Sequence, residues 1–134
     1  MRRPEIRTVR GCGSTMSLLA WQFDEYPQFH GDRMNLLVHI VAVPAFELAT
    51  IALVASAVNR SPVAVAASAA VAVAAFAAQA RGHAMEVNAP VPFSGPRNAL
   101  ARIFAEQFVT FPRFVLSGGW ARAYRSAGSG TAES

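Results

Sequence analysis

The three histidines are the residues of this sequence best suited to chemistry, and all of them lie in two short polar runs. His30 and His39 belong to HGDRMNLLVHIVAVP, residues 30–44, and His83 lies close to Glu86 in a second run, GHAMEVNAP. Each run borders a long apolar segment. Histidines and a carboxylate can bind a first-row metal, and two histidines with one carboxylate are the usual ligands of non-haem iron(II) oxygenases. The pattern is consistent with a metal site formed by side chains distant in sequence.

The spacing alone leaves structural interpretations open. His30 and His39 are nine residues apart, about half a turn out of phase on a continuous helix, so they converge only if the chain bends near Gly31. In the structural alternative, His39 bonds Asn35 or a carbonyl within a helical bundle, and His83 is a polar residue that ends an apolar helix. Neither interpretation follows from spacing by itself.

Two apolar segments determine the expected fold. Hydrophobic residues make up 53% of the chain and charged residues 15%, against roughly 25% charged in an ordinary soluble domain. Segments 36–58 and 61–80 are each close to the about 20 residues needed to cross a bilayer. The short turn at 59–62 joins them, which predicts an all-α fold, a small integral membrane helical hairpin. The alternative for the alanine-rich segment 61–80 is a buried helix of a soluble bundle.

Hairpin geometry brings the two histidine runs to one side of the membrane. His39 lies about twenty residues before the turn and His83 about twenty after it, so at 1.5 Å per residue both lie roughly 30 Å from the turn. At this end of the hairpin, Gln79, His83 and Glu86 share one helical face, as do Asn35 and His39. The two polar faces are expected to meet.

The basic residues indicate membrane orientation. The net charge is +4, and all twelve basic residues are arginines. Several flank the outer ends of the two apolar segments, whereas only Arg60 lies at the turn, which predicts that both termini are cytoplasmic in an inner or plasma membrane. The arginines are otherwise scattered, so nucleic acid is not an expected partner. The single Cys12 excludes an internal disulfide and a cysteine-rich metal site.

Less hydrophobic segments flank the hairpin. Residues 1–15 are expected to form a disordered basic tail, residues 16–125 a membrane-embedded helical domain, and residues 126–134 a second disordered tail. The pattern also predicts a short helix beginning at Ser17 and a helix over 98–117, both amphipathic and interfacial.

In the helix predicted over 98–117, Arg102 and Glu106 have the i,i+4 spacing of a surface ion pair. Gly118 and Gly119 are expected to end this helix.

The polar residues of the two runs resemble a known family. The residues that carry the resemblance are Tyr26, His30, Asn35, His39 and Pro44, followed by Gly82, His83, Glu86 and Pro90. This pattern is similar to that of the small membrane proteins related to the 2-hydroxy fatty acid dioxygenase of phytosphingosine conversion to odd-numbered fatty acids. The resemblance covers about residues 16–125.

The resemblance implies a specific site and reaction. Fe(II) is expected to bind His30, His39 and His83, with Glu86 as a further ligand or as a group that orients one through a hydrogen bond. The expected reaction uses molecular oxygen to cleave a 2-hydroxy fatty acid and leaves a fatty acid one carbon shorter. Asn35 is expected to hold an imidazole tautomer or the polar head of the substrate.

Other expectations concern the substrate and the alternatives to an enzyme. An arginine such as Arg33 or Arg81 is expected to pair with the substrate carboxylate. The expected partners are a lipid or fatty-acid substrate and the bilayer, with a homo-oligomer as a possibility. The alternatives are a non-enzymatic membrane scaffold with structural histidines, and a b-type haem protein with two axial histidines.

Overall fold

Helices account for all regular structure in the residues described, 17–129 of a computed structural model. In chain order they are α1 (Leu18–Glu25), the 3-10 helix η1 (Tyr26–Phe29), α2 (Arg33–Val58), α3 (Pro62–His83), α4 (Pro96–Ala105), the π-helical turn η2 (Glu106–Thr110), α5 (Phe111–Leu116) and α6 (Gly119–Ser129). The all-α prediction is confirmed. The tail predicted for residues 1–15, which includes Cys12, lies outside the described residues.

Helices α2 and α3 form the predicted antiparallel hairpin. The turn between them uses Arg60 in the left-handed region, with φ of 55°. Helix α2 begins three residues before the apolar segment because the Asp32 side chain accepts a hydrogen bond from the Asn35 N–H at 2.9 Å and caps the first turn. Helix α3 begins at Pro62, whose fixed φ suits a first helical position, and continues to His83.

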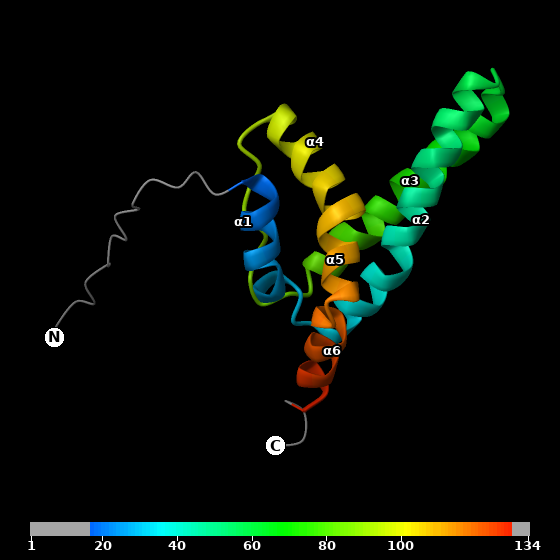
Figure 1. Cartoon of the computed structure of the whole chain (residues 1–134). Helices are drawn as coiled ribbons and strands as arrows, with labels where there is room; N and C mark the ends of the chain where they lie inside the picture. The colour runs from blue at the N-terminus through cyan, green and yellow to red at the C-terminus, as the bar shows by residue number, and fades with distance from the viewer. Residues whose placement is uncertain (1–16, 130–134) are drawn as a thin grey trace, which may run out of the picture.

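The outer faces of the hairpin are apolar and exposed. Val41, Val63 and Val73 are 70%, 80% and 69% exposed, and the end of the hairpin where α2 meets α3 projects beyond all the other helices (Figure 1). Both helices are long and apolar enough to be candidate membrane spans. Helices in a soluble bundle bury such side chains against their neighbours, so the exposure favours contact with lipid.

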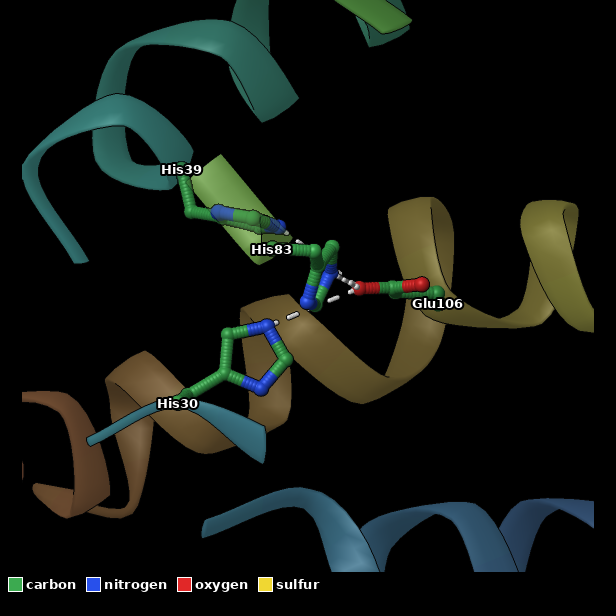
Figure 2. Close-up of side chains that lie close together, drawn as sticks. All are labelled: His30, His39, His83 and Glu106. Atoms are coloured by element: carbon green, nitrogen blue, oxygen red, sulfur yellow. Dashed lines mark ion pairs between the residues drawn. The ribbon is translucent and has the colours of Figure 1, made fainter. Parts of the chain in front are cut away.

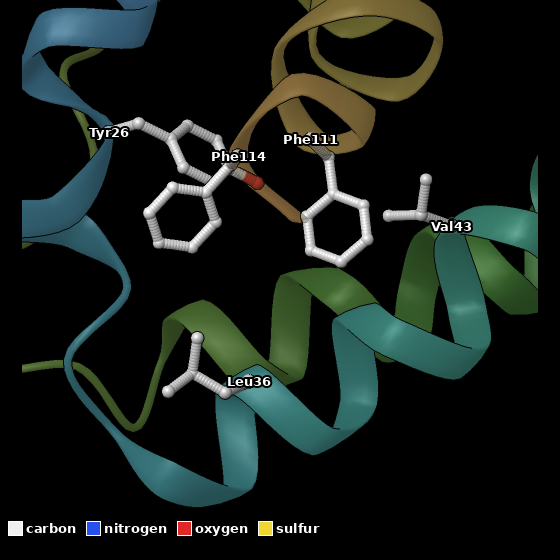
Figure 3. Packing of buried hydrophobic residues seen from close by; sticks show 5 residues of the cluster. All are labelled: Tyr26, Leu36, Val43, Phe111 and Phe114. Atoms are coloured by element: carbon white, nitrogen blue, oxygen red, sulfur yellow. The ribbon is translucent and has the colours of Figure 1, made fainter. Parts of the chain in front are cut away.

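The remaining helices pack around the open end of the hairpin. A core of buried residues joins η1, α2 and α5, and Figure 3 shows Tyr26, Leu36, Val43, Phe111 and Phe114. In addition, the indole N–H of Trp120 donates a hydrogen bond to the Leu36 carbonyl oxygen at 3.0 Å, which fixes α6 against α2. This packing places α5 and α6 next to the end of the hairpin that carries the histidines (Figure 1).

The helix predicted over 98–117 is interrupted. It begins at Pro96, because the Gly95 carbonyl accepts the first helical hydrogen bond, and it is divided into α4 and α5 by η2. Gly118, with φ of +79°, ends α5 as predicted. Helix α6 then continues to Ser129, so the first four residues of the tail predicted for 126–134 are helical.

Candidate metal centre

The three imidazole rings meet at one point, although they come from three separate segments. His30 follows η1, His39 lies in the second turn of α2, and His83 is the last residue of α3. Each pair of rings has its centroids 4.8 Å apart, and all three pairs meet edge to face, with interplanar angles of 89°, 78° and 81° (Figure 2). His30 and His39 reach the same point because the chain leaves helical structure between His30 and Asp32, the bend expected near Gly31.

Backbone carbonyls determine which imidazole nitrogen faces the centre. Nδ1 of His30 lies 3.0 Å from the Tyr26 carbonyl oxygen, and Nδ1 of His39 lies 2.9 Å from the Asn35 carbonyl oxygen. A carbonyl oxygen can only accept, so in neutral rings both Nδ1 atoms carry the proton and both Nε2 atoms keep a free lone pair. These Nε2 atoms are buried and have no hydrogen-bond partner among residues 17–129. A buried imidazole nitrogen that has a free lone pair and no protein partner is suited to bind a metal ion.

A carboxylate that sequence reasoning did not select completes the cluster. Glu106 Oε1 lies 3.8 Å from Nε2 of each of His30, His39 and His83 (Figure 2). Two atoms that each bind one ion at about 2.0–2.2 Å are at most about 4.4 Å apart, so all three separations are compatible with a shared ion. Together the four side chains form one group that could hold a metal ion. The residues therefore fit a metal ion held by three imidazoles and one carboxylate.

Local geometry explains why Glu106 was missed. The sequence pattern placed Glu106 in a regular helix, as the surface partner of Arg102. In the structure Glu106 is the first residue of the π-helical turn η2, and its carboxylate lies beside the three imidazoles. The guanidinium of Arg102 instead donates hydrogen bonds to the carbonyl oxygens of Val91 and Pro92, at 2.9 and 3.1 Å. The predicted Arg102–Glu106 surface pair is therefore wrong.

Glu86 lies outside the cluster of possible ligands, which corrects its assignment as a metal ligand. Its carboxylate accepts hydrogen bonds from the backbone N–H groups of Gly31 and Asp32, at 3.0 and 3.1 Å, and from the side-chain amide of Asn35. These bonds hold the bend that carries His30 into the centre. Glu86 therefore acts through hydrogen bonds, the second role considered for it, and Glu106 is the carboxylate of the cluster that could hold a metal ion.

Asn35 contributes to the site through two different groups. Its backbone carbonyl fixes the tautomer of His39, while its fully buried side chain bonds Glu86. Asn35 thus connects the bend before α2 with the segment after α3. The prediction that Asn35 holds an imidazole tautomer agrees with this geometry, but the contact comes from the main chain.

Burial and neighbouring groups shift the ionisation equilibria around the centre. Burial lowers the pKa of His30 to about 3, and the nearby His39 adds to this effect, so His30 is neutral at pH 7. Burial raises the pKa of the Tyr26 phenol well above its ordinary value, and the adjacent Glu106 raises it further. The Tyr26 hydroxyl is thus protonated and donates a hydrogen bond to Glu106 Oε1 at 3.2 Å.

The carboxyl of Glu106 stays ionised. Burial alone raises its pKa, but the proximity of His83, His30 and His39 outweighs this effect and holds the pKa below its ordinary value. A neutral imidazole, as at His30, and an ionised carboxylate, as at Glu106, are the protonation states in which such side chains bind metal ions.

A cavity of about 300 Å³ adjoins the cluster. His30, His83 and Glu106 form part of its wall, next to Arg102. Most of the remaining wall is apolar or aromatic, and includes Trp21, Phe29, Phe76, Val91, Phe93 and Ile103. A metal centre at the side of an apolar cavity is suited to a substrate with one polar end and a hydrocarbon chain.

Comparison with known proteins assigns the chain to a family. A family described as "2-hydroxy-palmitic acid dioxygenase Mpo1-like" matches residues 16–111, a range that contains all three histidines and Glu106. No curated protein and no solved structure matches the chain. Because the match spans most of the sequence, from before α1 to the start of α5, this chain belongs to the Mpo1-like family.

Proposed function

We propose that this protein is a membrane-embedded, Fe(II)-dependent dioxygenase that shortens 2-hydroxy fatty acids by one carbon. The observation that carries the proposal is the convergence of three imidazole Nε2 atoms on one oxygen of Glu106, beside an apolar cavity. Family membership supplies the class of substrate.

The donor set suits iron. His30, His39 and His83 would hold the ion through Nε2, and Glu106 would hold it through Oε1. Nitrogen and oxygen ligands without sulfur are those found in non-haem Fe(II) oxygenases. Bound Fe(II) supplies the capacity to bind and reduce dioxygen.

The proposed reaction balances without an added reductant. A 2-hydroxy acid and one dioxygen molecule contain the same atoms as a carboxylic acid one carbon shorter, carbon dioxide and water. The C1–C2 bond breaks, C2 is oxidised to the new carboxyl group, and C1 leaves as carbon dioxide. Since the substrate supplies all four electrons, oxygen uptake and shortened acid are expected in equal amounts.

The residues around the centre have defined roles in this proposal. The Tyr26 hydroxyl orients Glu106 through its hydrogen bond, and its ring stacks on His30 with centroids 3.7 Å apart. Tyr26 therefore fixes one ligand by hydrogen bonding and another by packing. The apolar wall of the cavity limits access of water to the polar end of the substrate.

The exposed faces of α2 and α3 support membrane insertion. In this arrangement the histidine end of the hairpin lies at the cytoplasmic surface, so an acyl chain stays in the bilayer while its polar head reaches the centre. A Cys12→Ser variant that also carries Ser61→Cys tests the orientation. In intact cells a membrane-impermeant maleimide is expected to label this variant at position 61 and to leave the wild-type protein, whose one cysteine is Cys12, unlabelled. Labelling at Cys12 alone would reverse the orientation.

Metal content and oxygen consumption test the reaction. Detergent-purified protein loaded anaerobically with Fe(II) is expected to consume oxygen with 2-hydroxypalmitate and to release pentadecanoate in a one-to-one ratio. Palmitate, which has no 2-hydroxyl group, is the matched control and is expected to give no uptake. Purified protein that binds no metal, or binds iron without turnover, contradicts the proposal.

The site geometry disfavours the two alternatives drawn from the sequence. A scaffold with structural histidines gives no reason to leave Nε2 of His30 and His39 buried and unpartnered. A haem needs a flat macrocycle between two axial imidazoles, but each pair of rings here is edge to face at 4.8 Å around a shared point. An absorption spectrum with a Soret band would restore the haem interpretation.

A further inference from the structure

The wall of the cavity beside the metal centre includes one cationic side chain that is not among the possible metal ligands. Arg102 lines the cavity together with His30, His83 and Glu106. The ion pairs found among residues 17–129 all join a histidine to Glu106, so none of them neutralises Arg102. Its Nε atom is buried and has no hydrogen-bond partner in the same part of the chain. A carboxylate in the cavity would find a charged donor available to it.

Contacts around Arg102 hold the guanidinium in place. Its two terminal nitrogens donate to the carbonyl oxygens of Val91 and Pro92. The rings of Trp21 and Phe93 lie on its faces, with centroids 5.1 and 4.7 Å from the guanidinium carbon. These contacts restrict the side chain before any ligand binds, so little conformational freedom is lost on binding.

The position of Arg102 relative to the metal ligands suits a 2-hydroxy acid. Arg102 precedes Glu106 by four residues, about one helical turn, which separates their Cβ atoms by about 6 Å. A carboxylate held by Arg102 would therefore place the adjacent C2 and its hydroxyl group near the centre. The hydrocarbon chain would extend along Phe76 and Ile103, which also line the cavity. Phe76 is 39% exposed on α3, so the cavity reaches the surface proposed to face lipid.

Neither arginine suggested by the sequence occupies such a position. Arg33 lies over the Tyr124 ring, 4.2 Å from its centroid, and neither Arg33 nor Arg81 lines the cavity. Besides Glu106, the acidic residue Glu25 lines the cavity, and its carboxylate accepts a hydrogen bond from Gln28. Glu25 opposes binding of an anion near α1, which favours entry of the carboxylate from the Arg102 side.

We infer that Arg102 binds the carboxylate of the fatty-acid substrate and so selects free acids over neutral lipids. This inference rests on the proposed function for the identity of the reaction, but carboxylate recognition itself can be measured without turnover. Palmitate and its methyl ester are suitable probes, because they share the acyl chain and differ in charge.

The experiment is calorimetric titration of each probe into anaerobic, Fe(II)-loaded protein in a neutral detergent. The wild-type protein is expected to prefer palmitate to the ester. Arg102→Gln is expected to weaken palmitate binding about tenfold or more and to leave ester binding unchanged, because hydrogen bonds to a charged group are lost. Arg97→Gln is the matched control, since Arg97 lies in the same helix α4 and does not line the cavity.

Each other outcome has a defined meaning. Equal palmitate binding by the wild-type protein and Arg102→Gln overturns the inference, as does equal weakening in Arg97→Gln. If Arg102→Gln does not fold, Arg102→Lys replaces it. This variant keeps the charge without the planar fork and is expected to bind palmitate with intermediate affinity; wild-type affinity for palmitate and an unchanged preference over the ester would count against the inference. Arg102-dependent palmitate binding without oxygen uptake from 2-hydroxypalmitate would refute the proposed reaction and support the recognition site.

Discussion

Gly82 of α3 lies against the side chain of Asn35 in α2 so closely that a Cβ atom at position 82 would overlap Asn35 Oδ1. Asn35 is fully buried and its amide group bonds Glu86, so it has little freedom to move away. The contact lies next to His83 and sets how closely the two hairpin helices approach at the metal centre. The close approach of these helices therefore requires a residue without a side chain at position 82.

The first prediction follows from this contact. Gly82→Ala is expected to displace Asn35, weaken its bond to Glu86 and lower stability by about 1–3 kcal/mol, the usual effect of overpacking a filled core. Thermal unfolding and iron content measure the two effects, and both are expected to fall. Gly95→Ala is the control, because a Cβ atom there meets no atom within 4 Å. Equal behaviour of the two variants would mean that the hairpin adjusts without loss.

The second prediction separates the two carboxylates. Glu106→Gln removes a ligand and is expected to change the visible spectrum of Co(II)-substituted protein and to weaken metal binding at least tenfold. Glu86→Gln removes a charge that accepts hydrogen bonds from the bend, so it is expected to lower thermal stability and affect affinity less, with the ligand set unchanged. A Co(II) spectrum altered only by Glu86→Gln would return the ligand position to Glu86.

The third prediction concerns the histidine that tolerates substitution best. The side chain of His83 is 17% exposed, against 2% and 0% for His30 and His39, so His83→Ala leaves the smallest buried void. This variant is expected to insert and fold normally while losing bound iron. Circular dichroism and metal analysis check the two parts. A variant that is both unfolded and metal-free would favour a structural role for His83.

The fourth prediction concerns a buried pair of amides that connects α3 to η2. The side chains of Gln79 and Gln107 exchange two hydrogen bonds, at 3.0 and 2.7 Å. Either single leucine substitution leaves one buried amide unsatisfied and is expected to destabilise the protein by about 1–3 kcal/mol, whereas the double substitution is expected to be much closer to neutral. A double-mutant cycle from chemical unfolding measures the coupling. Additive effects would show that the pair contributes no coupling.

The fifth prediction tests how the π-helical turn is held. Gln22 donates to the Arg102 carbonyl oxygen at 3.0 Å and accepts from the Thr110 hydroxyl at 2.9 Å. Thr110→Val removes one of these bonds and is expected to loosen the turn that begins at Glu106, lowering the turnover number several-fold with iron still bound. Thr50→Val is a control of the same shape, since the Thr50 hydroxyl bonds only its own helix, at the Phe46 carbonyl. Identical kinetics in both variants would show that the hydrogen bond from Thr110 to Gln22 does not affect turnover.

The sequence contains enough information to predict the hairpin and the meeting of its histidines. Segment length fixes where a membrane helix turns, and equal distances from that turn place His39 and His83 together whatever the details of packing. The half-turn mismatch between His30 and His39 similarly requires a bend near Gly31. These predictions depend on simple periodicity, which the structure follows in α2 and α3.

The carboxylate of the cluster could not be predicted from regular periodicity, because Glu106 lies at the start of a π-helical turn. Hydrogen bonds join this turn to other helices, from Thr110 to Gln22 of α1 and between Gln107 and Gln79 of α3, and a local sequence pattern does not show them. Helix α6 extends further along the chain than predicted for a related reason. Its glycines and serines are weak helix formers, but Trp120 anchors it to α2.

The four side chains of the centre come from four segments that are not joined to one another by a ladder of backbone hydrogen bonds, as the strands of a sheet would be. An ion bound to all of them would act as a cross-link between the hairpin and the helices that pack on it. Metal loading and assembly of the tertiary structure would then be one equilibrium, in which free ion at one hundred times its dissociation constant adds about 2.7 kcal/mol to stability. The supply of iron in the cell would thus affect how much of this protein folds and escapes degradation, in addition to how much of it is active.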